Sequence, residues 1–211
     1  MKCLLLSLTF IMGCFADSMD DAIKYGKSFK SMRAFYLKGL QPKRIGIGVN
    51  GFISGESRSV VFLHELDLVS AAAAKANQEL RDVPKDQVQH GFAGTGTIVW
   101  LEVSATGENN MRSISQKYTQ ELPHLVLQLG GKTFQPTTKQ LNKVESGGGF
   151  VYVGSDDLDR RKLSLVIEYS FDIPEAEIKQ EAEIVLIDLK GRQVRKKVDL
   201  SKAMIPAYAW K

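Results

Sequence analysis

The chain has 211 residues, of which 44% are hydrophobic and 25% are charged, and its formal net charge is +4. This composition is ordinary for a globular protein and lacks the strong positive excess that nucleic-acid-binding proteins carry. The length is enough for one full hydrophobic core or for two small ones, so one β domain and two small β domains both stay open. Beyond the N-terminal segment, the sequence has no apolar run long enough to span a bilayer.

Residues 1–16 predict an export signal. Lys2 is followed by the apolar run CLLLSLTFIM, which is too short for a membrane-spanning helix. Cys14 and Ala16 are small residues at the positions that signal peptidase requires for cleavage before Asp17. The stretch IMGC also resembles the lipobox of bacterial lipoproteins, in which Cys14 would be lipidated and become the new N-terminus. Both routes stay open, and they predict a periplasmic protein, a lipoprotein of the outer membrane or cell surface, or a secreted protein.

Both cysteines, Cys3 and Cys14, lie in this N-terminal segment. Cleavage therefore predicts a mature protein without an intramolecular disulfide, a thiol nucleophile or a cysteine metal site. The fold must then depend on its hydrophobic core, which a domain of this size can supply.

Residues 17–40 predict a basic amphipathic helical segment. Apolar side chains recur at steps of three and four residues along one stripe, which is formed by Ala22, Tyr25, Phe29, Met32 and Tyr36. The basic residues of the segment are Lys24, Lys27, Lys30, Arg33 and Lys38. Such a helix can lie on an anionic membrane or contact a partner. The interpretation that we prefer is a helix that packs on the domain with its basic side in water.

Residues 41–211 predict a single antiparallel β-sandwich domain with an immunoglobulin-like architecture and one inserted helix. The hydrophobic period changes to two after residue 43, and strand-like runs follow one another with short turns. The expected strands are Val60–Val69, Thr97–Val103, Leu125–Leu129, Phe150–Val153 and Leu163–Ile173, and the inserted helix is Ser70–Asp82. The hallmark Cys-Trp-Cys pattern of true immunoglobulin domains is absent, so the label describes architecture alone.

The C-terminal part predicts a β-hairpin and an aromatic tail. Ile184–Leu189 is apolar on both faces and should be central, whereas the charged return strand over Val194–Leu200 suits a sheet edge. Lys190 and Gly191 supply the turn between them. We expect the tail with Tyr208 and Trp210 to fold back and close the bottom of the sandwich.

A glycine motif raises the question of nucleotide binding. The stretch RIGIGVNGFISGE contains G-x-G-x-x-G at Gly46, Gly48 and Gly51. Val49–Phe52 (VNGF) resembles the opening of glyceraldehyde-3-phosphate dehydrogenases, but ISGE replaces the GRIG expected next. A dinucleotide turn needs a helix directly after the glycines, and here a serine-rich stretch and a strand follow. We therefore predict no cofactor and interpret the glycines as a bulged or kinked strand that allows a close neighbour.

Candidate catalytic and metal-binding residues are few. The three histidines are His64, expected in mid-strand, His90, expected in a loop, and His124, expected at a strand start. None of them has the spacing of a zinc site, and GESRS around Ser57 lacks the final glycine of a nucleophile elbow. The acidic turn with Asp156, Asp157 and Asp159 lacks the glycine and glutamate of an EF-hand. We predict no catalytic residue and no bound metal.

Three classes of function remain open. The first is an exported, non-catalytic binding or structural module of the bacterial cell envelope, whose partner is a protein or an envelope component and not a nucleic acid. The second is a sandwich that binds a small ligand or carbohydrate on exposed aromatic side chains, for which Trp100, Tyr152 and Tyr169 are the candidates. The third is a secreted hydrolase that uses one of the histidines. We adopt the first because it accounts for the export signal and for the strand-rich pattern.

Overall fold

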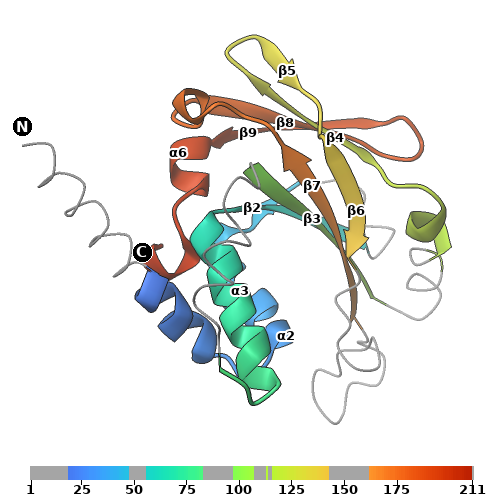
Figure 1. Ribbon diagram of the computed structural model, residues 1–211. Coiled ribbons are helices and arrows are strands. Elements are labelled where there is room, and N and C mark those ends of the chain that lie inside the picture. The colour runs from blue at the N-terminus through green and yellow to red at the C-terminus, as the bar shows by residue number, and fades with distance from the viewer. Residues whose placement is uncertain are drawn as a thin grey trace, which may run out of the picture. The chain divides into compact units, whose positions relative to one another are not determined.

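A computed structural model of the protein describes residues 19–47, 56–82, 97–106, 113, 116–142 and 162–210. Within them, residues 19–42, 63–82 and 205–210 belong to one compact unit, which we call the helical unit, and the other residues belong to a second, which we call the sheet unit (Figure 1). The helical unit is therefore assembled from three segments that are far apart in the sequence.

The sheet unit contains two antiparallel sheets. Every pairing whose register is described is antiparallel. The first sheet has the order β1 (Ile45–Gly46), β2 (Glu56–Leu63), β3 (Thr97–Thr106), β7 (Lys162–Phe171) and β6 (Thr138–Asn142). The second has the order β5 (Lys132–Phe134), β4 (His124–Leu129), β8 (Glu181–Ile187) and β9 (Gln193–Asp199). The prediction of a mostly β protein built from antiparallel strands is confirmed.

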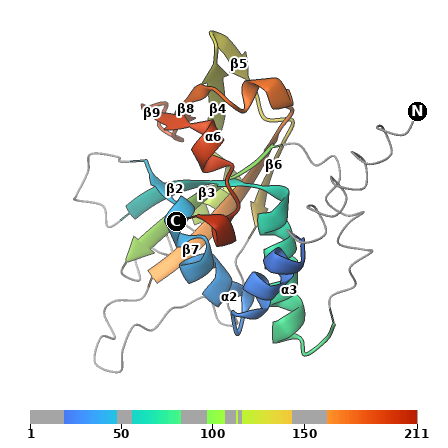
Figure 2. The same ribbon diagram turned by 90° about the vertical axis from the view of Figure 1, so that its left-hand side faces the viewer.

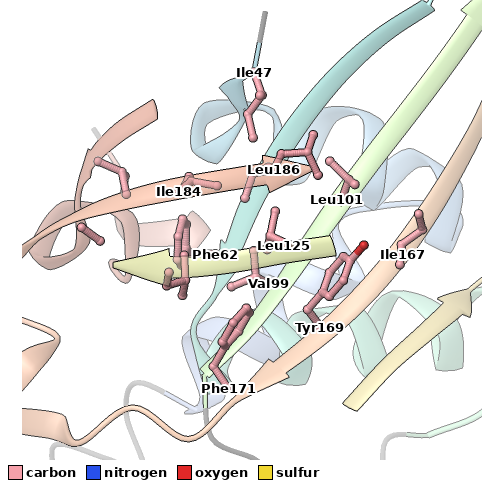
Figure 3. Packing of buried hydrophobic residues seen from close by; sticks show 14 of the residues in the cluster. Ile47, Phe62, Val99, Leu101, Leu125, Ile167, Tyr169, Phe171, Ile184 and Leu186 are labelled. Carbon is pink, nitrogen blue, oxygen red and sulfur yellow. The ribbon is translucent and has the colours of Figure 1, made fainter. Parts of the chain in front are cut away.

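One hydrophobic cluster contains side chains of both sheets (Figure 3). The period of two in β7 directs alternate side chains to this cluster, and Ile167 and Tyr169 are fully buried there. β3 pairs with β7 along its whole length, from Thr97 opposite Phe171 to Thr106 opposite Lys162. Other members labelled in Figure 3 are Ile47, Phe62, Val99, Leu101, Leu125, Phe171, Ile184 and Leu186.

The C-terminal hairpin has the arrangement that its sequence predicts. β8 lies between β4 and β9, and β9 is at the end of the described sheet. Gly191 in the turn has φ of 75°, a conformation that glycine adopts without steric cost. The side chain of Asp188 accepts hydrogen bonds from the backbone N–H groups of Lys190 and Arg192, at 2.8 and 2.9 Å. The hairpin is followed by the short helix α6 (Leu200–Ala203).

The stretch for which one helix is predicted is divided in the structure. A helix over residues 19–27 is followed by a bend, then by α2 (Met32–Ala34) and by the π-helical turn η1 (Phe35–Gly39). Ser31 is extended and its side chain accepts a hydrogen bond from the Ala34 N–H, so the chain starts a new helix at this point. Local capping thus competes successfully with the periodic apolar pattern.

Helix α3 (Glu65–Gln78) begins within the stretch for which the sequence predicts a strand. The prediction of a strand through Val69 with His64 in its middle is wrong, because β2 ends at Leu63. His64 Nδ1 accepts from the Leu66 N–H at 3.1 Å, and Asp67 Oδ2 accepts from the His64 N–H at 2.9 Å. This reciprocal cap satisfies N–H groups that a helix start leaves unpaired.

The helical unit packs through small residues. A Cβ atom on Gly26 would lie 2.1 Å from the Ser70 carbonyl oxygen and 2.7 Å from the Ala73 Cβ, so the helix over residues 19–27 approaches α3 closely (Figures 1 and 2). The C-terminal segment belongs to the same unit, since the Ala207 N–H donates to Asp67 Oδ1 at 2.6 Å. The tail is therefore part of the helical unit.

Candidate functional site

The basic residues singled out in the sequence are spread over several short elements. Four of them have exposed side chains, namely Lys24, Lys27, Lys30 and Lys38. The first two lie on the helix over residues 19–27, the third in the bend after it and the fourth in η1. Arg33 is in α2, but its side chain lies outside the described residues, as does the lipidation candidate Cys14.

The same segment, residues 19–39, also forms an aromatic cluster. Phe35 is fully buried and makes edge-on contacts with Phe29, at 5.5 Å between ring centroids, and with Tyr25, at 6.2 Å. The Tyr25 hydroxyl donates to the Gly39 carbonyl at 2.9 Å, which holds η1 against the helix over residues 19–27. Burial, together with the charge of Asp67, raises the pKa of Tyr25. Phe35 is absent from the apolar stripe of a single helix, and so the sequence analysis missed it.

The end of α3 holds the bend after the first helix. The Asn77 side-chain amide donates to the carbonyl oxygens of Lys27, at 3.2 Å, and Phe29, at 3.0 Å. The Gln78 Oε1 atom accepts from the Met32 N–H at 3.1 Å. The Asn77 bonds satisfy carbonyl oxygens at and just after the end of the first helix, and the Gln78 bond satisfies an N–H group at the start of α2. Together they fix the positions of residues 27–32 beside the end of α3.

The sheet unit contains a charged contact that the sequence analysis did not find. Arg44 makes a two-pronged ion pair with Glu102, at 2.5 Å from Nε and 2.8 Å from Nη2. The Ser59 hydroxyl donates to the same carboxylate at 3.0 Å. Paired guanidinium and carboxylate groups of this geometry are among the stronger polar contacts in proteins. No local pattern indicates the contact, because Arg44 and Glu102 are 58 residues apart.

Trp100 and Tyr169 lie on opposite faces of the first sheet. Tyr169 points into the shared core and its hydroxyl donates to the Pro123 carbonyl at 2.8 Å; burial raises its pKa well above the usual range. Trp100 is next to Val99, the residue opposite Tyr169, and its indole N–H donates to Glu168 at 2.9 Å. Both residues are buried, so these two do not form the exposed aromatic surface that the alternative of a ligand-binding sandwich would need. Tyr152 lies outside the described residues.

The candidate catalytic histidines have separate locations. His64 caps α3 through its Nδ1 atom. His124 is exposed at the first position of β4, opposite Ile187 of β8. His90 and the acidic turn with Asp156, Asp157 and Asp159 lie outside the described residues. Across the part of the chain that is described, His, Cys, Asp and Glu residues form no group of three that could hold a metal ion.

The glycine motif begins in a strand that pairs with the next strand. β1 contains Gly46, which lies opposite Ser59 of β2 in an antiparallel pair. A dinucleotide-binding βαβ unit would need these strands to be parallel. A Cβ on Gly46 would meet nothing within 4 Å, so the expectation of a close neighbour is wrong at this residue. Gly48 and Gly51 lie outside the described residues.

Among the described residues, no helix is both long enough and apolar enough to cross a bilayer. No protein-family model matches the chain, and no curated protein matches it. Among solved structures, the chain is similar to a protein of unknown function from Burkholderia pseudomallei, with a TM-score of 0.47 and 10% sequence identity. The similarity covers 85% of this chain and 95% of that chain.

Proposed function

We propose that the protein is an exported, non-catalytic binding module of the bacterial cell envelope, either lipidated at Cys14 or cleaved before Asp17. The observation that carries this proposal is the exposure of Lys24, Lys27 and Lys30 directly after the predicted leader. Their apolar neighbours pack inward, so the segment presents its ammonium groups to the surroundings. A cationic surface close to a lipid anchor suits the anionic headgroups of a bacterial membrane.

A structural role for the ionisable groups supports the non-catalytic part of the proposal. His64 uses Nδ1 to cap α3, and Glu102 and Glu168 accept hydrogen bonds from Arg44 and Trp100. These contacts stabilise secondary structure and neighbouring strands. The groups are thus engaged in maintaining the fold, which is the role expected of them in a binding or structural module.

We further propose that the two sheets form a sandwich of immunoglobulin-like architecture. The support is the single cluster to which both sheets contribute, for example through Leu101 of β3 and Leu125 of β4. Several connections run through residues 83–96 and 143–161, outside the described ranges. The immunoglobulin-like connectivity therefore stays a prediction, which an experimental structure of the mature protein would test.

The intact mass of the protein, produced in a bacterial host with its own leader, tests export and lipidation. A mass that begins at Asp17 supports a soluble exported protein, and a mass that begins at Cys14 plus acyl chains supports a lipoprotein. Cys14→Ser is the control variant, because it should abolish the acylated form while leaving cleavage before Asp17 available. A full-length mass with Met1 retained would contradict the export proposal.

A further inference from the structure

Leu80 is unusual in both its exposure and its backbone conformation. Its side chain is 95% exposed, and its φ of 53° lies in the left-handed region. It stands at the C-terminal end of α3, where the Arg81 N–H donates to the Ala76 carbonyl at 3.0 Å and the Leu80 N–H to the Asn77 carbonyl at 3.2 Å. Glycine normally occupies this position, since any residue with a Cβ is strained there. An apolar side chain is thus held in water at a position where glycine would suit the backbone better.

The lysine-bearing bend is held beside Leu80. Asn77, three residues before Leu80, binds the carbonyl oxygens of Lys27 and Phe29. Lys27 and Lys30 are both exposed. We call residues 27–32 and 77–82 together the α3 tip. It therefore combines one protruding apolar side chain with cationic side chains. Figure 1 shows the ribbon of α3, on which the tip lies at the C-terminal end.

The α3 tip also carries two acidic residues. Glu79 pairs with Arg81, so their charges offset each other locally. Asp82 is exposed. Lys75, one turn before Glu79, is exposed as well and adds to Lys27 and Lys30. The balance on the tip and the last turns of α3 is therefore positive, which favours an anionic partner.

We propose that the α3 tip docks on an anionic lipid bilayer, with Leu80 at the boundary between headgroups and acyl chains and Lys27 and Lys30 on the lipid phosphates. The inference rests on the proposed function and names the partner of its cationic surface. A stable protein interface buries about 800 Å² on each side around an apolar centre. One leucine among long charged side chains suits a bilayer interface better, because the lysine ammonium groups can reach the phosphates while the apolar side chain enters the membrane.

The weak binding expected of such a small contact is also consistent with a bilayer as the partner. A single acyl chain, or a small basic and apolar tip, binds membranes only weakly, whereas two such signals together give stable attachment. A lipid at Cys14 and the α3 tip would be two signals of this kind. The tip would then set which side of the helical unit lies on the membrane.

Co-sedimentation with vesicles tests this proposal. The full chain is produced in the Cys14→Ser background, so that no acyl chain contributes, and the intact mass confirms that all variants have the same N-terminus. Vesicles of phosphatidylethanolamine and phosphatidylglycerol are compared with vesicles of phosphatidylcholine alone. Leu80→Asn should weaken binding to the anionic vesicles about tenfold through the lost apolar contact. Lys27→Gln with Lys30→Gln should weaken it by roughly thirtyfold, and added salt should act in the same direction.

Matched controls separate the tip from general surface effects. Ile205→Asn removes another exposed large apolar side chain of the helical unit, in the segment that contacts the start of α3 through Asp67. Lys139→Gln with Lys196→Gln removes two exposed charges of the sheet unit. Both controls should bind as the parent chain does. Asparagine tolerates the left-handed conformation, so Leu80→Asn should melt no lower than the parent chain, and a loss of binding cannot then reflect unfolding.

Three results would overturn the inference: no binding of the parent chain to anionic vesicles, equal binding to phosphatidylcholine, or unchanged binding of both tip variants. If the parent chain did not bind anionic vesicles, a protein would remain as the partner of the cationic surface. The export proposal fails independently, through a retained Met1 in the intact mass, and each proposal can therefore be rejected without the other.

Discussion

The sheet unit and the helical unit are stabilised in different ways. The sheet unit buries large side chains that alternate along its strands, such as Leu127 of β4 and Ile167 of β7. The helical unit brings backbones together through small residues, such as Gly26 against Ala73, and closes its ends with side-chain caps. The stability of the sheet unit should therefore be sensitive to substitutions that shorten a buried side chain, and the stability of the helical unit to substitutions that enlarge one.

Removing volume from the sheet core should have the largest effect. Ile167 is fully buried and lies among side chains of both sheets. Ile167→Ala should lower the free energy of unfolding by about 4 kcal/mol, because the apolar contacts are lost and a cavity remains. Urea denaturation measures this, with Gln140→Ala on the exposed part of β6 as the control, expected to change stability by less than about 0.5 kcal/mol. An equal loss in both variants would contradict the assignment of Ile167 to the core.

Adding volume to the helix contact tests the other half of the comparison. Gly26→Ala would place a methyl group 2.1 Å from the Ser70 carbonyl oxygen. We expect a loss of about 2 kcal/mol, since the clash outweighs the gain of about 1 kcal/mol in helix propensity. Gly46→Ala is a matched control, because its Cβ would meet nothing within 4 Å. If Gly26→Ala were stabilising in the same urea assay, the close approach of the helix over residues 19–27 to α3 would be wrong.

The same difference explains how much of the fold can be predicted from the sequence. The strand Lys162–Phe171 could be predicted because a period of two in hydrophobicity is a local property of the sequence. The central and edge strands of the C-terminal hairpin could be predicted from local patterns in the same way. The start of α3 was missed, although His64 and Asp67 have the spacing of a reciprocal cap, because the neighbouring apolar run also suits a strand.

The candidate site depends on contacts that no local pattern encodes. The bonds from Asn77 to Lys27 and Phe29 join residues 50 and 48 positions apart. The sequence indicated the lysines but not what lies beside them. The left-handed conformation of Leu80 was equally hidden, since leucine is not a residue that marks such a position.

The turn of the C-terminal hairpin should make the sheet unit sensitive to acid. Burial alone would raise the pKa of Asp188, but hydrogen bonds from the Arg192 side chain and from the backbone N–H groups of Arg192 and Lys190 bring it below the ordinary value of 3.8. A lowered pKa means that this stabilisation is present above the unfolded-state pKa and is lost as the pH falls through the folded-state pKa. Asp188→Ala should therefore cost about 1.5 kcal/mol at pH 7 and progressively less below about pH 4.

Urea denaturation from pH 7 to pH 2.5 measures this dependence. Asp172→Ala is the control, because Asp172 is exposed beyond the end of β7 and its loss should have little effect on stability at any pH. A penalty for Asp188→Ala that stays constant down to pH 2.5 would mean that shape alone, and not the carboxylate charge, stabilises the turn.

The smallest expected effect has the opposite sign and concerns the end of α3. Leu80→Gly should raise the free energy of unfolding by about 0.5–1 kcal/mol, because glycine adopts the left-handed conformation without the strain that a Cβ causes. The added flexibility of glycine in the unfolded chain offsets part of this gain. Lys75→Gly, in the last turn of α3 and with an exposed side chain, is the control and should be destabilising by about 0.5–1 kcal/mol. Thermal unfolding followed by circular dichroism distinguishes the two variants, and a lower melting temperature for Leu80→Gly would show that the leucine side chain stabilises the fold. A higher melting temperature would mean instead that the chain retains Leu80 at a cost in stability, as expected if its side chain serves in binding at the α3 tip.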